Sequence, residues 1–349
     1  MKGQAAVITG LGAVSPYGIG VDLFWRKLVL GITAFRPITR FDAAPFRNIL
    51  AGEVPDFPTP SGTSSAAAFC ETAAVEAASQ ALLQGCNPRR TGLILGTNFG
   101  GAETLLRALA RIGEAPSTPP ELSSASMGEG LAMVRRKIPI QGPCAVLSLT
   151  CASGAAALGL ALSWIREGRA DVVLAGGYDE LSLHAYAGLS SLRAITPDRI
   201  RPFDARRNGA LFSEGAGMVV VESERHARER NASPLARLTG RGMNNDAFHM
   251  TAPDPSGRGI AAVMRMALAD AGISPKEVVH VNCHATGTKY NDLIETQGIK
   301  QVFGDQAYRL VLTANKSCIG HALGAAGALE AIAAILSIRE GVIPPTMGL

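Results

Sequence analysis

Short apolar segments recur along the chain, and each is bounded by glycine or by a charged residue. Four of them lie at residues 5–9, 92–96, 171–175 and 218–221. Apolar runs of this length are typical of strands that are buried on both faces. Between them lie stretches rich in alanine and leucine, such as 64–84 and 154–166, whose composition favours helices. This alternation predicts an α/β protein with layered sheets.

One of these helical stretches has a counterpart later in the chain. Residues 151–168 and 324–341 both begin with small side chains and both end in Ile-Arg-Glu-Gly, at a constant offset of 173 residues. An apolar run comes shortly before each of them, at 146–149 and at 310–313. The similarity predicts a duplicated fold, although alanine-rich helices can also resemble one another by composition alone.

We therefore divide the chain into an N-terminal half, residues 1–235, and a C-terminal half, residues 236–349. The first half continues past Gly168 through two more strand-like segments, whereas eight residues follow Gly341. If the halves are equivalent, the second sheet lacks strands and leaves an exposed edge, which proteins usually avoid. We expect that a tail has been removed, that another chain supplies these strands, or that the protein is naturally abbreviated.

Cys151 is the first candidate for chemistry, because it follows a predicted strand and begins a helix of small residues. A thiol in the first turn of a helix faces the positive end of the helix dipole and unpaired backbone N–H groups. Both favour the thiolate, and the N–H groups can also bind an oxyanion. A free cysteine is more often a simple core residue, so this segment alone leaves both interpretations open.

Two histidines stand in comparable positions in the second half. His284 follows the apolar run 278–281 in a polar turn that contains glycine, and His321 precedes the repeated helix. Each of them taken alone fits a structural residue that caps the end of a strand. If the two halves pack about a pseudo-twofold axis, however, the turns that carry Cys151 and His321 meet at its centre.

Composition and charge exclude several other classes of protein. The net charge of +4 comes from basic residues that are interspersed with acidic ones, which does not favour a nucleic-acid partner. The six cysteines form no CxxC pair, so we expect neither a metal site nor disulfides, and a cytoplasmic location fits best. The N-terminal apolar run is too short for a signal or membrane helix. The glycines at 10–18 do not fit the dinucleotide-binding spacing, so no cofactor is expected.

Several motifs, spread over essentially the whole chain, stand in a characteristic order. They are VITGLGAVSP at 7–16, TCASG at 150–154, RPFD at 201–204, EGAG at 214–217, HATGT at 284–288, the Lys-Ser and Gly-His pairs within 316–321, and PPT at 344–346. In this order they resemble the β-ketoacyl synthases of the thiolase superfamily, specifically the elongating type with a Cys-His-His triad.

The resemblance implies a duplicated, five-layer α/β/α/β/α thiolase-like fold whose halves are related by a pseudo-twofold axis. It also implies a homodimer that works with acyl carrier protein and needs no cofactor, no metal, no nucleic acid and no membrane. The implied activity is a 3-oxoacyl-acyl carrier protein synthase of fatty acid or polyketide synthesis, which condenses an acyl-cysteine with a malonyl thioester. The alternatives are a non-condensing partner subunit and a defective homologue.

The resemblance also assigns roles to individual residues. Cys151 takes the acyl group, while His284 and His321 bind the malonyl thioester carbonyl and promote decarboxylation. Lys316 polarises the site. The remaining assignments are Asp292 and Glu295 as the ionic support of Lys316, Glu214 in a supporting role, and Thr286 and Thr288 as substrate-binding residues.

Three departures from the family pattern accompany these assignments. Ala285 stands where the family usually has glycine, and we expect its methyl group to be tolerated if its φ angle is negative. Residues 128–131, Gly-Glu-Gly-Leu, replace a more apolar segment of the acyl pocket, which puts the preferred chain length in doubt. The family also continues past Pro-Pro-Thr to a Gly-Phe-Gly-Gly loop, whereas this sequence stops at Leu349.

Overall fold

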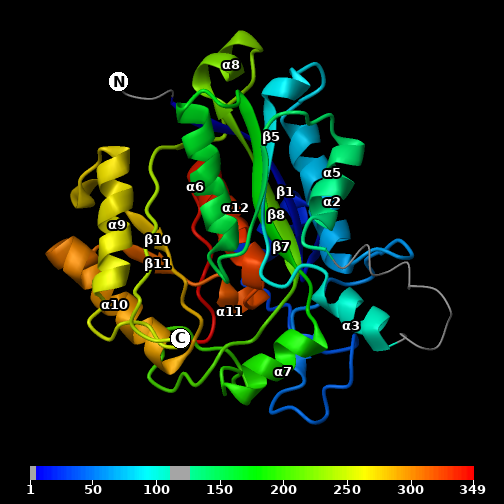
Figure 1. The fold of residues 1–349 in the computed structure, drawn as a ribbon. Coiled ribbons are helices and arrows are strands. Elements are labelled where there is room, and N and C mark those ends of the chain that lie inside the picture. The colour runs from blue at the N-terminus through cyan, green and yellow to red at the C-terminus, as the bar shows by residue number, and fades with distance from the viewer. Residues whose placement is uncertain (1–4, 111–125) are drawn as a thin grey trace.

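A computed structural model describes residues 5–110 and 126–349 of the chain, which folds around a large mixed sheet (Figure 1). The strands of this main sheet follow the order β2-β1-β8-β7-β5-β6, and β9 pairs with β1. They are β1 (Ala6–Ser15), β2 (Gly18–Ile19), β5 (Thr91–Gly96), β6 (Cys144–Leu147), β7 (Val172–Asp179), β8 (Gly215–Ser223) and β9 (Ala236–Leu238). As predicted, the central strands β1, β5, β7 and β8 are buried along their whole length.

The sheet combines parallel and antiparallel pairing. β5 runs parallel to β6 and β7, whereas β8 runs antiparallel to β1 and β7. The first strand is longer than the sequence pattern suggested, because it continues to Ser15 through a glycine-rich stretch that reads as a loop. A Cβ atom on Gly12 would lie 1.9 Å from the carbonyl oxygen of Ala73, so glycine here allows a helix to pack directly on the strand.

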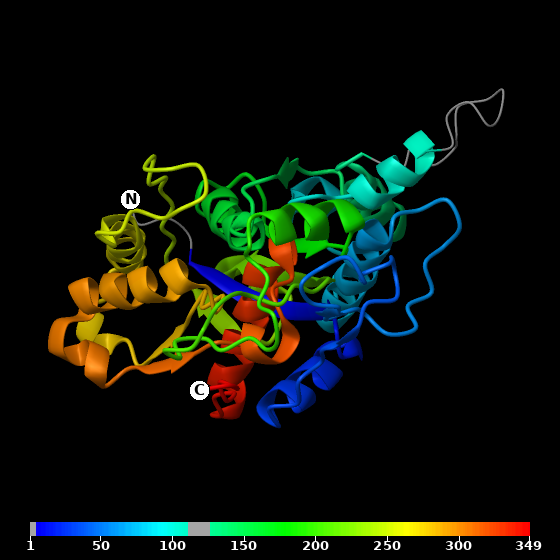
Figure 2. The same cartoon turned by 90° about the horizontal axis from the view of Figure 1, so that it is seen from below.

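Helices cover both faces of the main sheet and build five layers. On one face lie α2 (Ser65–Gln80) and α5 (Glu129–Lys137), and on the other lie α6 (Ser153–Arg166) and α12 (Ala326–Glu340). Beyond α6 and α12 come the parallel strands β10 (His280–Asn282) and β11 (Val311–Thr313). The outer layer is formed by α9 (Arg258–Ala271) and α10 (Lys289–Phe303) (Figures 1 and 2). The five-layer α/β/α/β/α prediction is confirmed.

The two repeated helices, α6 and α12, meet at the centre through reciprocal contacts. A Cβ atom on Gly154 would lie 2.9 Å from the backbone nitrogen of Ala328, and one on Gly327 would lie 2.8 Å from that of Ala155. At the repeat offset of 173 residues, Gly327 is equivalent to Gly154 and Ala328 to Ala155. Contacts in which each partner plays both roles are the mark of a twofold relation. The small side chains of the repeat therefore serve to bring the two helices together.

The second sheet contains two strands, β10 and β11, within the described residues. The remaining elements connect the layers. They are α1 (Val21–Val29), β3 (Arg36–Pro37), β4 (Leu50–Ala51), α3 (Ala102–Ala110), α7 (Leu183–Ser191), α8 (Glu224–Glu229), α11 (Lys316–Ile319) and the 3-10 helices η1 (Pro88–Arg90), η2 (Pro275–Glu277), η3 (Gly304–Tyr308) and η4 (Leu323–Ala325).

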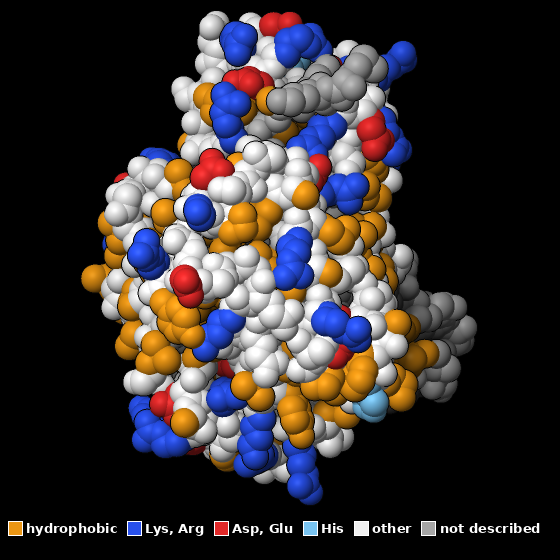
Figure 3. All heavy atoms as spheres, turned by 90° about the vertical axis from the view of Figure 1, so that its left-hand side faces the viewer, with side chains coloured by type: hydrophobic (Ala, Val, Ile, Leu, Met, Phe, Trp, Pro, Cys, Tyr) orange, Lys and Arg blue, Asp and Glu red, His pale blue; other side chains and the backbone are white. Residues whose placement is uncertain are grey.

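The surface agrees with the dispersed charge of the sequence. On the face that contains α9 and α10, basic side chains are separated from one another by apolar and uncharged ones (Figure 3). In the part of the chain that the structure describes, no helix combines the length and the apolar character that crossing a bilayer requires.

Candidate active site

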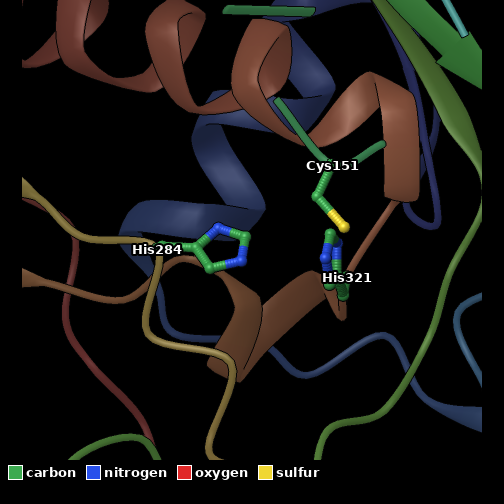
Figure 4. Close-up of side chains that lie close together, drawn as sticks. All are labelled: Cys151, His284 and His321. Atoms are coloured by element: carbon green, nitrogen blue, oxygen red, sulfur yellow. The ribbon is translucent and has the colours of Figure 1, made fainter. Parts of the chain in front are cut away.

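The side chains of Cys151, His284 and His321 lie close together and form a catalytic centre (Figure 4). The sulfur of Cys151 and one ring nitrogen of each histidine all lie within 4.8 Å of one another. Cys151 comes from the turn before α6, His284 from the turn after β10, and His321 from the segment between α11 and η4. The structure thus brings together the turns of Cys151 and His321, as the pseudo-twofold axis predicted, and adds His284 to them.

A tight turn presents the Cys151 side chain to this centre. Thr150 has a φ angle of 51°, in the left-handed region that residues with a side chain rarely adopt. The hydroxyl of Ser153 holds the turn, because it accepts a hydrogen bond from the Leu149 N–H at 2.8 Å and donates one to the Thr150 carbonyl at 2.7 Å. The thiol therefore lies at the beginning of α6.

Burial dominates the acidity of the Cys151 thiol. It raises the pKa of Cys151 to about 11, while the ammonium group of Lys316 acts in the opposite direction. The backbone N–H group and the charge that favour the thiolate are present, but burial outweighs them in the resting site. At neutral pH the residue is a thiol, and its proton has to leave during the reaction.

The two histidines form a neutral pair. Burial and the charge of Lys316 hold the pKa of both His284 and His321 well below the usual value. Their rings lie perpendicular to each other, with centroids 5.2 Å apart. Both imidazoles are therefore uncharged at neutral pH, and each has one nitrogen that can donate a hydrogen bond.

A backbone contact sets the tautomer of His321. Its Nδ1 accepts a hydrogen bond from the Leu323 N–H at 3.1 Å, which places the ring proton on Nε2. This Nε2 is buried and has no partner among the described residues. The Phe212 ring stacks on the imidazole at a centroid distance of 5.7 Å and keeps it in place. His321 thus offers a free N–H donor to a substrate atom.

The same tautomer bears on metal binding, because Cys151, His284 and His321 are the donor set of a possible zinc site. A histidine binds a metal through a ring nitrogen that carries no proton. Since the Leu323 N–H occupies Nδ1 of His321, the Nε2 atom presents a proton and not a lone pair. The site is therefore better suited to an oxygen atom of an organic substrate than to a metal ion.

Glu295 fixes the backbone around His284. Its carboxylate accepts hydrogen bonds from the N–H groups of His284 at 2.7 Å and Ala285 at 2.8 Å. Ala285 has a φ angle of 40°, so the condition on which its tolerance was predicted, a negative φ, is not met. The alanine is held in a strained conformation that glycine adopts freely.

We expect the Ala285→Gly variant to be more stable than the wild type, by up to about 1 kcal/mol, because glycine removes the strain of the left-handed conformation. The measurement is urea-induced unfolding followed by circular dichroism. Ala175, which is equally buried in β7 but does not adopt a positive φ, provides the control. Ala175→Gly is expected to lower stability, and a loss of stability in both variants would show that Ala285 is not strained.

Asp292 connects two of the sequence motifs. Its carboxylate accepts hydrogen bonds from the N–H groups of Phe203 at 2.8 Å and Gly287 at 3.1 Å, which joins the Arg-Pro-Phe-Asp segment to the turn after His284. The hydroxyls of Thr286 and Thr288 in this turn lie 2.9 Å apart. Asp292 therefore orders the loop on which both threonines stand.

Lys316 has a different ionic partner from the one predicted. Its ammonium group, almost fully buried, forms an ion pair with Glu330 of α12. Asp292 and Glu295 form no direct ion pair with Lys316, and their oxygens accept hydrogen bonds from backbone N–H groups instead. Lys316 acts on Glu295 through space, where it opposes the rise in pKa that burial causes. The sequence contained a signal for Glu330, since it is the one charged residue between His321 and Arg339.

Glu214 lies outside the catalytic centre but supports the segment that holds His321. It is fully buried and accepts hydrogen bonds from Arg40 at 2.6 Å and from the N–H groups of Val54 at 2.8 Å and Leu181 at 3.0 Å. The preceding residue, Ser213, donates its N–H to the His321 carbonyl at 3.0 Å. The supporting role of Glu214 in the reaction stays a prediction.

The sequence interpretation missed Asp179, a buried residue at the end of β7. Its carboxylate accepts a hydrogen bond from the hydroxyl of Thr97, directly after β5. It also accepts hydrogen bonds from four backbone N–H groups, which belong to Asn98, Phe99 and Gly100 after β5 and to Gly324 near the start of the second repeated helix. It thereby ties the two halves together beside the active site. An acidic residue directly after a long apolar strand was the available signal.

Two family models match the chain. The model of the beta-ketoacyl synthase N-terminal domain matches residues 4–227, and that of the C-terminal domain matches residues 235–349. Among curated proteins, 3-oxoacyl-[acyl-carrier-protein] synthase 2 of Coxiella burnetii is 37% identical over 370 residues. That alignment covers 100% of this chain and 89% of the relative.

Solved structures agree with this similarity. The ketosynthase/chain length factor of ishigamide synthesis has a TM-score of 0.92 at 36% identity, and the match covers 99% of this chain and 88% of that one. A type II polyketide ketosynthase, AntDE, in complex with its acyl carrier protein AntF has the same TM-score at 30% identity, with the same coverage.

Proposed function

The chain belongs to the β-ketoacyl synthase family, and on this basis we propose that Cys151, His284, His321 and Lys316 carry out the decarboxylative condensation of an acyl thioester with malonyl-acyl carrier protein. The product is a 3-oxoacyl-acyl carrier protein of fatty acid or polyketide synthesis. One observation carries the proposal: a thiol, two neutral imidazoles and a free Nε2–H donor on His321 converge in one buried place.

In the first half-reaction, the Cys151 sulfur attacks the carbonyl carbon of an acyl thioester. A carbon–sulfur bond to Cys151 forms, the bond to the carrier thiol breaks, and the proton of Cys151 ends on the leaving thiol. The N–H groups of Ala152 and Ser153 are engaged by backbone carbonyls of the preceding turn. We therefore assign the oxyanion of this step to the N–H of Cys151 itself, at the positive end of the α6 dipole.

In the second half-reaction, the malonyl thioester takes the place of the departed carrier. The carbonyl oxygen of this thioester accepts a hydrogen bond from His321 Nε2–H and a second one from His284. As carbon dioxide leaves, negative charge moves onto this oxygen as an enolate, and preformed donors in a buried site stabilise that charge more strongly than water does. The positive charge of Lys316 acts in the same direction.

The enolate carbon then attacks the acyl-Cys151 thioester. A carbon–carbon bond forms, the carbon–sulfur bond to Cys151 breaks, and the released sulfur takes up a proton from solvent to restore the thiol. A pKa of about 11 gives the resting thiol little tendency to ionise. Lys316 lowers the cost of the transient thiolate in both half-reactions, because it favours the charged form of Cys151.

Binding roles follow from the same arrangement. We assign Thr286 and Thr288 to the arm that carries the thioester, because their hydroxyls lie on the turn directly after His284. The partner is acyl carrier protein, as in the AntDE complex with AntF. The outer strand β6 leaves one edge of the main sheet unpaired in the described chain, which supports a homodimer.

The division into halves at residue 235 is part of the same proposal, supported by the ranges of the two family models. β9 lies just beyond that boundary, yet it pairs with β1 of the first half, so the halves are joined through the main sheet. The six cysteines of the chain are all free, which supports a location in the cytoplasm, where thiols remain reduced.

The test supplies the purified protein with an acyl-carrier protein and then with malonyl-carrier protein. We expect an acyl adduct on Cys151 by mass spectrometry, followed by release of carbon dioxide and formation of one 3-oxoacyl product per turnover. Acylation without a condensed product would identify a defective homologue. Neither acylation nor decarboxylation would identify a non-condensing partner subunit. Either result would overturn the proposal.

A further inference from the structure

A second group of ionisable side chains lies apart from the catalytic centre. Arg40 reaches from the surface toward three buried glutamates, Glu53, Glu180 and Glu214, which are at most 5% exposed. They come from three places in the fold: Glu53 from the loop after β4, Glu180 from the residue after β7, and Glu214 from the residue before β8. If all four groups were ionised, the cluster would hold a net charge of −2.

Two of these glutamates have hydrogen-bond donors on both carboxyl oxygens. Glu214 accepts hydrogen bonds from Arg40 and from two backbone N–H groups, so both of its oxygens have donors. Glu53 accepts two hydrogen bonds from the N–H groups of Thr39 and Arg40 and a third from the Thr39 hydroxyl. Burial raises the pKa of Glu214, while Arg40 and the two backbone N–H groups act in the opposite direction.

Glu180 differs from both. Its Oε2 accepts a single hydrogen bond, from the Ala66 N–H near the start of α2 at 3.2 Å. Its Oε1 is buried and has no partner among the described residues, and Arg40 pairs with Glu214. A cation site does not explain the arrangement, since the other carboxylate oxygens already have donors and one free oxygen cannot hold a metal ion. A proton on Glu180 does explain it.

The charges around Glu180 agree with this interpretation. Burial raises the pKa of Glu180 to about 7, and the negative charge of Glu214 adds to the rise. The Ala66 N–H of α2, Arg40 and Arg107 of α3 act in the opposite direction. The pKa of Glu180 is therefore raised for the same reason that its Oε1 has no partner: the carboxyl group is buried among too few hydrogen-bond donors.

We propose that Glu180 is a proton-binding site, and that release of its proton loosens the junction between the segment that carries Arg40, the end of β7 and the start of β8. This junction adjoins the frame of the active site. Asp179, which binds the Gly324 N–H, precedes Glu180 directly, and Ser213, which binds the His321 carbonyl, precedes Glu214. The protein therefore carries a pH-dependent element that is separate from the catalytic thiol.

The sign of the effect follows from proton linkage. The pKa of Glu180 is about 7 in the folded protein and 4.5 as the ordinary value. Such a group adds its full contribution to the free energy of unfolding below pH 4.5, and this contribution is lost as the pH rises through 7. Between pH 5 and pH 8 the folding constant is expected to fall by about 100-fold on account of Glu180 alone. Glutamine has nearly the shape of the protonated acid but cannot ionise, so Glu180→Gln lacks this loss.

The test compares urea-induced unfolding of the wild type and of Glu180→Gln at pH 5 and pH 8. We expect similar stability at pH 5 and a clear advantage of the variant at pH 8. Glu222→Gln is the matched control, since Glu222 is another buried glutamate, but hydrogen bonds with Arg230 and His226 outweigh its burial and lower its pKa. This control is expected to be less stable than the wild type at pH 8. An equal difference between wild type and Glu180→Gln at both pH values would overturn the proposal.

A spectroscopic measurement gives a second, independent outcome. Infrared difference spectra of wild type minus Glu180→Gln are expected to show the carbonyl band of a protonated carboxyl group at pH 6, which disappears as the pH passes about 7. This band reports the proton even if the variant is poorly stable. A carboxylate band in its place at pH 6 would contradict the proposal, whatever the unfolding curves show.

Discussion

Replacing Cys151 with alanine is expected to lower the rate of condensation by about a thousandfold or more, because the acyl group then has no nucleophile to which it can be transferred. The measurement is formation of the 3-oxoacyl product from acyl- and malonyl-carrier protein. No acyl adduct should be detectable by mass spectrometry. Cys86→Ala removes a half-buried free thiol from the loop between α2 and η1 and is expected to leave the rate unchanged.

The same variant separates the two half-reactions. Decarboxylation depends on His284 and His321, and both remain when Cys151 is removed. We therefore expect Cys151→Ala to release carbon dioxide from malonyl-carrier protein without forming product, and His321→Ala to lose both activities. If Cys151→Ala still condenses, the thiol is not the nucleophile. If His321→Ala decarboxylates as fast as the wild type, the free Nε2–H is not the donor to the enolate.

Much of the architecture was predictable because it depends on patterns that are local along the chain. The buried strands are continuous apolar runs, and the pairing of α6 with α12 followed from a repeat of small residues. The same repeat placed the turn of Cys151 opposite that of His321. The full length of β1 was not predictable, since the glycines that extend it are explained by the close approach of α2, a contact across the sequence.

The parts of the site that escaped prediction depend on backbone geometry and on long-range contacts. The positive φ of Ala285 occurs in a turn whose N–H groups are bound by the carboxylate of Glu295, and no local pattern shows these contacts. The state of the Cys151 thiol depends on how deeply it is enclosed, which a helix-start motif does not reveal. The partner of Lys316 was visible as an isolated charge in an apolar helix, but its significance became clear when the two helices were placed side by side.

Removing the charge of Lys316 is expected to affect both stability and reactivity. Lys316→Met leaves Glu330 without its ion-pair partner in a mostly buried position, which should lower the free energy of unfolding by about 3 kcal/mol. The double variant Lys316→Met/Glu330→Gln leaves no unpaired charge, so most of this loss should be recovered. Urea-induced unfolding of the two variants measures the difference. Equal losses in both would show that the pair is solvated and contributes little.

The reactivity of Cys151 distinguishes a catalytic effect of Lys316 from a structural one. With a pKa of about 11, the alkylation rate of Cys151 by iodoacetamide should rise about tenfold per pH unit between pH 7 and pH 10. Lys316 lowers this pKa, so Lys316→Met and the double variant should both react more slowly than the wild type over the whole range. The double variant also removes Glu330, whose charge raises the pKa of Cys151 by less than Lys316 lowers it, so it should react faster than Lys316→Met but still more slowly than the wild type. If it reacted as fast as the wild type, Lys316 would serve folding alone, and the thiolate of the proposed reaction would need another source of stabilisation.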